Sequence, residues 1–201
     1  MLAPTLHTDA GARPPSAADQ LETARLRLRM FRAEDLDAMS EITRDPEVMR
    51  FIGHGHPMSR EETRANIESI VAAFRRRGFG RWALELKETG ALTGYCGLTQ
   101  GSEDAGVELA YMLARGAWGR GLVQEAGRAC LRYGFERLGA DAIAGLTFKD
   151  NLRSRRVLER LGMTFVGDAH YYGFDCVHYR VARADWRDDW RDDGSPCRVK
   201  S

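Results

Sequence analysis

The feature that most restricts the fold of this chain is the segment Leu113–Ala126, LARGAWGRGLVQEA, in which an apolar strand pattern passes through three glycines into a helical pattern. Gly116, Gly119 and Gly121 allow the backbone to turn tightly and to approach a ligand closely. The N–H groups and the positive dipole end of the following helix favour a phosphate at that point. The segment therefore predicts a strand–loop–helix unit that binds an anion.

Two common nucleotide-binding motifs do not fit this segment. A Walker loop needs GxxxxGK followed by Ser or Thr, whereas here Arg120 lies between two glycines and no such hydroxyl residue follows. A dinucleotide fingerprint needs GxGxxG, and Gln124 stands where its third glycine would be. The anion is therefore expected to belong to another class of cofactor.

The composition predicts one soluble domain with no polyanionic partner. The chain has 201 residues, 43% of them hydrophobic and 29% charged, and a net charge of +1. It holds no apolar run near the roughly 20 residues of a membrane span and no concentrated basic stripe, so we expect neither a membrane nor a nucleic-acid partner. Arg75–Arg77, a run of three basic residues, is better explained as a helix end, where cations meet the negative dipole end.

The cysteines and the ends of the chain predict a cytoplasmic protein. The four cysteines lie far apart without a CxxC pair, which suggests neither a zinc site nor a disulfide framework. Residues 1–20 carry no apolar signal region and are expected to form a loose tail. Residues 186–201, with the repeated WRDD sequence, are expected to form a second tail with two docking tryptophans. This leaves residues 21–185 as the folded domain.

The order of the predicted elements indicates an α/β fold. Alternating apolar residues mark strands, and apolar residues three and four apart mark helices. In chain order the elements are a strand (26–30), a helix (33 to near 45), a helix from Ser59 to Gly78, an antiparallel hairpin (82–86 and 92–98), a strand (107–113), a helix from the glycine loop to Gly139, a strand (142–148), a helix from Asn151 to Gly162 and two strands around Tyr172 and Tyr179. The order β-α-α-β-β-β-α-β-α-β-β predicts a single-domain, mixed, largely antiparallel sheet flanked by helices.

Several motifs in this order resemble one family, the GNAT superfamily of N-acetyltransferases. Its RimJ/RimL-type branch, which acetylates ribosomal protein N-termini, has the loop pattern WGxGxAxEA, and this chain departs from it only where Val123 replaces a small residue. Similar segments lie in the same order along residues 21–182. They are TARLRLR from Thr23, DPEV from Asp45, FGRW from Phe79 leading into GALTG, and NLRSRRVLERLGM from Asn151.

The resemblance implies a cofactor site and a fold. It implies a GNAT-like fold that uses acetyl-coenzyme A as acyl donor, with no metal. The pyrophosphate would lie on the loop, formed by Trp118, Gly119, Arg120, Gly121, Leu122, Val123 and Gln124. The pantetheine arm would pair with the backbone of Tyr111, Met112 and Leu113, although a core-strand role explains their side chains equally well. Asn151 would lie beside coenzyme A, and it would also cap its helix in any soluble protein.

Glu108 is the candidate general base. Acyl transfer to an amine needs a neutral amine, a polarised carbonyl and a proton for the departing thiolate. Strand alternation places Glu108 on one face with Ala110 and Met112, where partial desolvation would raise the pKa of its carboxyl toward a useful range. The alternative is a solvated strand end, since Gly101–Gly106 is polar. The resemblance favours the base, because the family's proposed base is this glutamate.

Ser154 is the candidate acid that protonates the thiolate. Helical spacing puts it on the inward face with Val157, Leu158 and Leu161. Many GNAT enzymes use a tyrosine four residues further on, where this chain has Leu158. The RimJ/RimL-type branch is suggested to use a serine at the position of Ser154. A serine that bonds back to its own helix backbone explains the residue equally well.

Several questions stay open from the sequence. His54 and His56 lack the other ligands of a metal site, and the resemblance places them beside the acceptor pocket. The acceptor is an amine of unspecified kind, either a protein N-terminus or a small molecule. The sequence also leaves open a succinyl-type donor, a non-catalytic acyl-coenzyme A sensor and a homodimer, since dimers are frequent in this family.

Overall fold

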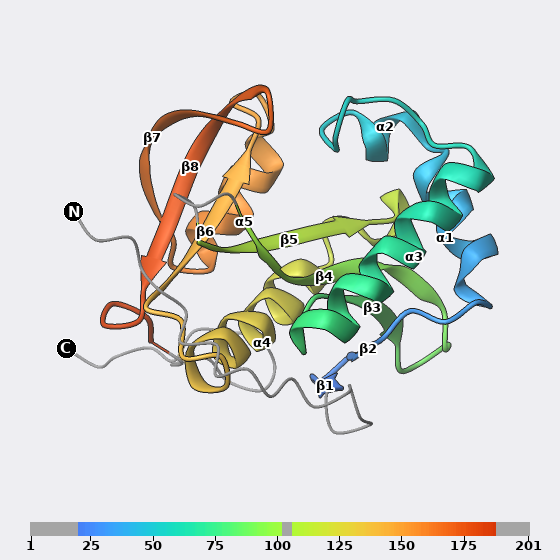
Figure 1. Ribbon diagram of the computed structural model, residues 1–201, viewed down its shortest axis with the longest axis horizontal. Helices are drawn as coiled ribbons and strands as arrows, with labels where there is room; N and C mark the ends of the chain where they lie inside the picture. Colours follow the sequence, from blue (N-terminus) through green and yellow to red (C-terminus); the bar gives the residue numbers. More distant parts are fainter. Residues whose placement is uncertain (1–19, 102–105, 188–201) are drawn as a thin grey trace.

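The computed structural model describes residues 20–101 and 106–187 as one eight-stranded sheet with helices on both faces (Figure 1). The strand order is β1-β2-β3-β4-β5-β6-β8-β7, and neighbours are antiparallel except β5 and β6, which run parallel. The predicted mixed, largely antiparallel α/β fold is therefore confirmed.

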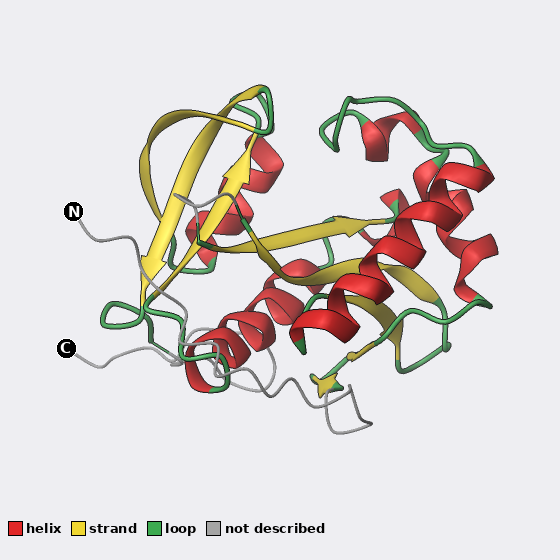
Figure 2. Ribbon diagram, viewed as in Figure 1, coloured by secondary structure: helices red, strands yellow, loops and turns green. Residues whose placement is uncertain are grey.

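The elements follow the predicted order, and the structure adds the two-residue strand β1 and the short helices α2 and η2 (Figure 2). The strands are β1 (Leu21–Glu22), β2 (Leu26–Arg29), β3 (Arg81–Leu86), β4 (Leu92–Gln100), β5 (Val107–Leu113), β6 (Ala142–Thr147), β7 (Thr164–Tyr171) and β8 (Phe174–Ala182). The helices are α1 (Asp35–Thr43), α2 (Pro46–Met49), α3 (Arg60–Arg77), the short 3₁₀ helix η2 (Arg115–Ala117), α4 (Leu122–Glu136) and α5 (Leu152–Arg160).

Local sequence signals explain where several helices begin and end. Ser59 and Glu62 form the predicted capping box at the start of α3, which ends at Gly78 with φ 78°. Arg75, Arg76 and Arg77 lie in the last turn of α3, as predicted. Helix α4 ends at Glu136, three residues before the predicted Gly139, which has φ 69° in the following turn.

Residues 45–49 form a short helix where the sequence suggests only a turn. The Asp45 side chain accepts a hydrogen bond from the Glu47 N–H at 3.0 Å and caps α2, whose first residue is Pro46. A proline disfavours helix at the residue before it but suits the first position of a new helix, because that N–H needs no partner. The same Asp-Pro pair therefore separates α1 from α2.

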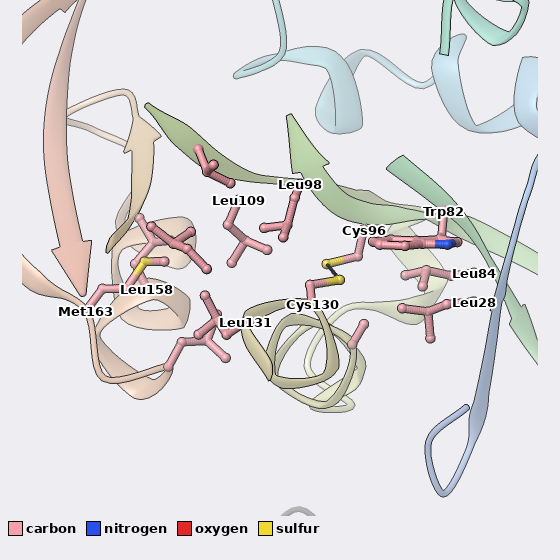
Figure 3. Packing of buried hydrophobic residues seen from close by; sticks show 14 of the residues in the cluster. Leu28, Trp82, Leu84, Cys96, Leu98, Leu109, Cys130, Leu131, Leu158 and Met163 are labelled. Atoms are coloured by element: carbon pink, nitrogen blue, oxygen red, sulfur yellow. Dashed lines mark hydrogen bonds between the residues drawn. The ribbon is translucent and has the colours of Figure 1, made fainter. Parts of the chain in front are cut away.

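The sheet has an apolar core on each face. The larger cluster packs α4 and α5 against the sheet, and Figure 3 shows its leucines around Cys96 of β4 and Cys130 of α4. The two sulfur atoms lie 3.7 Å apart and both cysteines are free. The second cluster packs α1, α2 and α3 on the opposite face, with Ala83, Tyr95 and Met112 of the sheet. Strand β5 contributes alternate side chains to both clusters.

Strands β5 and β6 separate just after Glu108. Two residue pairs, Val107 with Ile143 and Glu108 with Ala144, make up the parallel ladder between them, although β5 continues to Leu113. Figure 1 shows the two strands pointing apart beyond this point. Strand β5 stays paired with β4 from Val107 to Leu113, and among the described residues no second strand pairs with its backbone after Glu108. Its second edge can pair with an extended ligand.

Some expectations concern the ends of the chain. The predicted N-terminal tail and most of the C-terminal tail, with Trp190 and Cys197, lie outside the described residues. Trp186 packs on Phe135 of α4 with ring centroids 5.2 Å apart, so one of the two tryptophans docks as predicted. Among the described residues, no helix combines the length and apolarity that a membrane crossing requires.

Candidate active site

Glu108 is buried in the sheet at the point where β5 and β6 separate. Only 8% of the residue is exposed, so the alternative of a solvated strand end is wrong. Its neighbour in space is Gly101, where a Cβ atom would overlap the Glu108 carboxylate. A side chain at position 101 would therefore displace the carboxylate from its place.

The hydroxyl of Tyr172 donates a hydrogen bond to Oε1 of Glu108, with the two oxygens 2.7 Å apart. Tyr172 lies in the turn between β7 and β8 and is 61% exposed. This hydrogen bond holds the Oε1 atom of Glu108 toward the turn between β7 and β8. The sequence did not predict this contact, because the two residues are 64 positions apart.

Ser154 meets Tyr111 on the opposite face of β5. The two hydroxyl oxygens lie 2.7 Å apart, and either can be the donor. The Ser154 hydroxyl therefore has a hydrogen-bond partner on β5. A serine that only bonded back to its own helix backbone would not need such a partner. The Asn151 side chain accepts from the Ser154 N–H at 3.2 Å and caps α5, so the predicted cap is confirmed. These contacts hold Ser154 toward β5.

Tyr111 keeps its proton at neutral pH. Burial raises the pKa of its phenol well above the ordinary value, and the nearby Cys96 thiol acts in the same direction. The hydrogen bond with Ser154 opposes this rise without cancelling it. The pair therefore offers a neutral O–H donor behind the Ser154 hydroxyl. Tyrosine is absent at position 158, where Leu158 is buried in the core, but a phenol reaches the same helix from β5.

The glycine loop has the backbone conformation that the sequence predicts. Gly119 and Gly121 have φ 73°, a left-handed conformation that favours glycine. The first hydrogen bond of α4 runs from the Glu125 N–H to the Gly121 carbonyl at 3.1 Å. The N–H groups of Leu122, Val123 and Gln124 precede it and lie outside the helical ladder. This arrangement fits a pyrophosphate, the anionic part of coenzyme A.

Trp118 joins the loop to the end of β5. Its indole N–H donates to the Leu113 carbonyl at 2.9 Å, and the Arg153 guanidinium lies 4.8 Å from the centre of its ring. Gly119 and Arg120 are exposed beside it. A cationic α5 residue thus lies over the loop, which increases the attraction for an anion.

Glu125 ties the glycine loop to the first strands of the sheet. Its Oε1 accepts hydrogen bonds from the Thr23 hydroxyl at 2.5 Å and the Arg25 N–H at 2.7 Å, and its Oε2 accepts from Arg25 Nε at 2.6 Å. Arg25 also donates to the Arg120 carbonyl at 2.8 Å. Burial acts to raise the pKa of Glu125, but the hydrogen bonds from Thr23 and Arg25 outweigh it and lower the pKa below its ordinary value. The sequence does not predict this link, because Glu125 lies about 100 residues from Thr23 and Arg25.

The side chains of several other predicted cofactor residues pack in the apolar clusters, which leaves their backbone for contact with a ligand. The side chains of Met112, Leu113 and Leu122 are buried in the two apolar clusters, with exposures of 4%, 5% and 1%. Val123 is partly buried against the larger cluster. Its extra methyl groups therefore have a packing role. This explains why a residue larger than the one in the family's pattern stands here, which the sequence did not explain.

Aromatic rings from the loop after α2 contact rings at β6 and β8. The ring of His54 is 5.3 Å from Phe174 of β8, which is 5.6 Å from Phe148, and Phe148 is 6.1 Å from Phe51. These contacts join the loop after α2 to the ends of β6 and β8. Within residues 20–101 and 106–187, no group of three His, Cys, Asp or Glu side chains is arranged to hold a metal ion.

The comparisons with known proteins define the class of this fold and site. Residues 25–164 match the family model described as Acetyltransferase (GNAT) domain, which is more than half of the chain. The protein is therefore an acetyltransferase of the GNAT family, as the sequence motifs predicted.

Three similar proteins illustrate the breadth of this family. An uncharacterized protein of Bacillus subtilis (strain 168), YkkB, is 33% identical over 153 residues, 75% of this chain and 88% of its own. The FsC-acetyl coenzyme A-N(2)-transacetylase of Aspergillus fumigatus is 27% identical over 188 residues, 85% of this chain and 79% of its own. The crystal structure of an acetyltransferase from Agrobacterium tumefaciens str. C58 has a TM-score of 0.71 and 28% identity, covering 81% of this chain and 93% of that one.

Proposed function

We propose that this protein transfers an acetyl group from acetyl-coenzyme A directly to a primary amine, in a ternary complex of enzyme, donor and acceptor. One observation carries the proposal: a single strand, β5, holds buried Glu108 where it leaves β6 and runs straight into the glycine loop at the start of α4. Glu108 and Leu113 are five residues apart, about 17 Å along an extended strand. The strand thus connects a place for the acceptor to a place for the pyrophosphate.

The donor fits three features of the chain. The loop from Trp118 to Gln124 presents backbone N–H groups and a helix N-terminus to the pyrophosphate. The unpaired edge of β5 from Tyr111 to Leu113 accepts an extended arm as an added strand. The name of the Aspergillus fumigatus relative specifies acetyl coenzyme A, which supports the same donor here.

In the proposed reaction Glu108 accepts a proton from the acceptor's amine, directly or through water. The neutral nitrogen then attacks the thioester carbonyl, whose oxygen is polarised by backbone N–H groups of β5. Ser154 gives its hydroxyl proton to the departing thiolate, and Tyr111, within hydrogen-bond distance, gives a proton to Ser154 in turn. The role of Tyr111 replaces the tyrosine that position 158 lacks.

The proposal also covers the acceptor, the extent of the catalytic domain and the cellular compartment. The acceptor is a protein N-terminus, as in the RimJ/RimL-type branch, or a small-molecule amine. Residues 21–185 would form the catalytic domain, working in the cytoplasm. An enzyme that uses succinyl-coenzyme A keeps the same base and loop and differs only around the acyl group. A sensor without catalysis would bind the donor and release no coenzyme A.

The test measures coenzyme A release from acetyl-coenzyme A with a panel of amines: a peptide with a free N-terminus, phenylalanine, spermidine and kanamycin. The proposal expects at least one amine to accelerate release and Glu108→Gln to reduce kcat by about 100-fold, a usual contribution of a general base. The KM for acetyl-coenzyme A should stay within about twofold, since Glu108 is not part of the loop. A wild-type kcat in the Glu108→Gln variant would remove Glu108 from the mechanism, and donor binding without release would favour the sensor.

A further inference from the structure

Tyr172 occupies a backbone conformation that its side chain disfavours. It has φ 55°, and the next residue, Gly173, has φ 80°. Tyr171 and Phe174 on either side are paired across β7 and β8, so Tyr172 and Gly173 form a two-residue hairpin turn. Two central residues with positive φ are the requirement of a type I′ turn, in which Asn, Asp or Gly is favoured at the first position.

The free-energy cost of this backbone conformation suggests that Tyr172 has a functional role that offsets it. A bulky side chain is seldom found at positive φ, and strained positions of this kind cluster at functional sites. The ring of Tyr172 contributes little to the core, because the residue is 61% exposed. Its hydroxyl, in contrast, reaches the buried Glu108 carboxylate at 2.7 Å. The strained turn therefore aims this hydroxyl at Glu108.

Gly101 and Tyr172 act on the same oxygen of Glu108. A Cβ at position 101 would overlap Oε1, and Tyr172 donates to Oε1. Gly101 leaves the space that the carboxylate occupies, and the Tyr172 hydroxyl bonds the carboxylate in that place, so the hydrogen bond holds its orientation. Strand β8, which follows the turn, also lies near Glu108. Burial raises the pKa of the Cys176 thiol on β8, and the charge of Glu108 adds to this rise.

We propose that Tyr172 is a positioning residue, which orients the Glu108 carboxylate toward the acceptor's amine from the tip of the β7–β8 hairpin. This inference rests on the proposed function, since it assumes that Glu108 is the base. Because the Tyr172 ring is exposed, the acceptor passes beside it when it approaches Glu108. The hairpin turn thus sets both the orientation of the base and one border of the acceptor's entrance.

The kinetic test compares Tyr172→Phe, Glu108→Gln and the double variant with wild type, using the amine of the panel that gives the fastest coenzyme A release. Loss of a hydrogen bond to a charged group should lower kcat of Tyr172→Phe about 5- to 20-fold and leave the KM for acetyl-coenzyme A within twofold. In the Glu108→Gln background the same change should have no further effect on kcat, because Tyr172 acts through Glu108. Tyr133→Phe is the control, because its hydroxyl bonds the Gly78 carbonyl at 3.2 Å, away from Glu108. It should keep a wild-type kcat.

Thermal unfolding supplies a second test that needs no turnover. The Tyr172→Asn and Tyr172→Phe variants both lose the hydroxyl, but Asn suits the first position of the turn. The Tm of Tyr172→Asn should therefore exceed that of Tyr172→Phe by about 2 °C. The effects of Tyr172→Phe and Glu108→Gln on Tm should also be non-additive, because the two side chains share a hydrogen bond.

The outcomes separate the two proposals. If Glu108→Gln loses activity while Tyr172→Phe keeps a wild-type kcat, the base stands and the positioning role of Tyr172 is overturned. If Glu108→Gln keeps a wild-type kcat, or no amine is acetylated, the proposed function fails and the thermal measurements decide whether Tyr172 holds Glu108. Additive effects on Tm, or a Tyr172→Asn variant less stable than Tyr172→Phe, would overturn the inference on their own.

Discussion

The hydroxyl of Tyr111 lies 2.7 Å from the hydroxyl of Ser154 and joins β5 to α5 behind the proposed path of the thioester. Ser154 is further held by the Asn151 cap at the start of the same helix. The pair therefore combines a protonated phenol, whose pKa burial raises, with a hydroxyl on a fixed helix turn. Such a pair can deliver a proton to a leaving thiolate without a tyrosine on α5.

We expect Ser154→Ala to reduce kcat by about 100-fold, because it removes the hydroxyl that we propose as the proton donor to the leaving thiolate. Tyr111→Phe should reduce kcat less, by about 10-fold, because Ser154 keeps its own hydroxyl. Steady-state coenzyme A release at saturating acetyl-coenzyme A measures both. Equal wild-type rates in Ser154→Ala and Tyr111→Phe would rule out the proton path.

Local patterns predicted much of the fold and half of this site. The capping box at Ser59, the cap at Asn151 and the positive φ of Gly119 and Gly121 depend on neighbours within four residues, so the sequence contains them fully. Strand alternation placed Glu108 on one face of β5, and its burial confirms the inward direction. The periodicity of apolar residues gave the order of these elements, and the family motifs added the class of enzyme.

Contacts between distant residues could not be predicted in the same way. Tyr172 meets Glu108 only because a strained turn aims it across the sheet, and neither residue's neighbours indicate the other. Glu125 belongs to the loop motif, but its partners Thr23 and Arg25 lie about 100 residues away. The motif at Thr23 and the motif at Glu125 resemble the same family, and the structure supplies the physical reason: each holds the other in place.

We expect Glu125→Gln to weaken both stability and donor binding. The carboxylate accepts three hydrogen bonds from Thr23 and Arg25, and the loss of its charge should lower the free energy of unfolding by about 1–2 kcal/mol. Because Arg25 also holds the Arg120 carbonyl of the loop, the KM for acetyl-coenzyme A should rise about 3- to 10-fold with kcat nearly unchanged. Chemical denaturation and donor titration measure the two effects, and a variant with wild-type KM would show that the loop needs no support from Arg25.

The buried ion pairs at Arg29 predict how stability depends on pH. The hydrogen bond from Arg29 lowers the pKa of the Glu85 carboxyl; burial opposes it, and Arg27 adds a further hydrogen bond. A carboxyl whose pKa is lower in the folded state stabilises the fold above its unfolded pKa of about 4.3, and this contribution is lost as the pH falls through the folded pKa. Glu85→Gln should therefore be less stable than wild type by about 1–2 kcal/mol at pH 7. The difference should shrink below about pH 4.

Urea unfolding of wild type and Glu85→Gln between pH 3 and pH 7 measures this difference. The exposed pair of Glu41 and Arg44, at 2.7 Å, provides a control, because exposed pairs contribute little. Glu41→Gln should leave stability unchanged at each pH. A difference for Glu85→Gln that stays constant down to pH 3 would show that packing of the side chain, and not its charge, stabilises the fold.

The three glycines of the loop provide a matched series for the pyrophosphate site. Gly119 and Gly121 have φ 73°, where an alanine is strained by about 1–2 kcal/mol, whereas no positive φ is found at Gly116 and a Cβ there would meet no atom within 4 Å. Gly119→Ala and Gly121→Ala should therefore shift the loop and raise the KM for acetyl-coenzyme A about 10-fold or more, while Gly116→Ala keeps the wild-type value. Isothermal titration with coenzyme A measures the affinities of the three variants without an acceptor, and they should follow the same order. If Gly116→Ala weakened the binding of coenzyme A as much as Gly121→Ala does, side-chain bulk near the ligand would govern binding. The left-handed backbone of Gly119 and Gly121 would then not be what forms the pyrophosphate site.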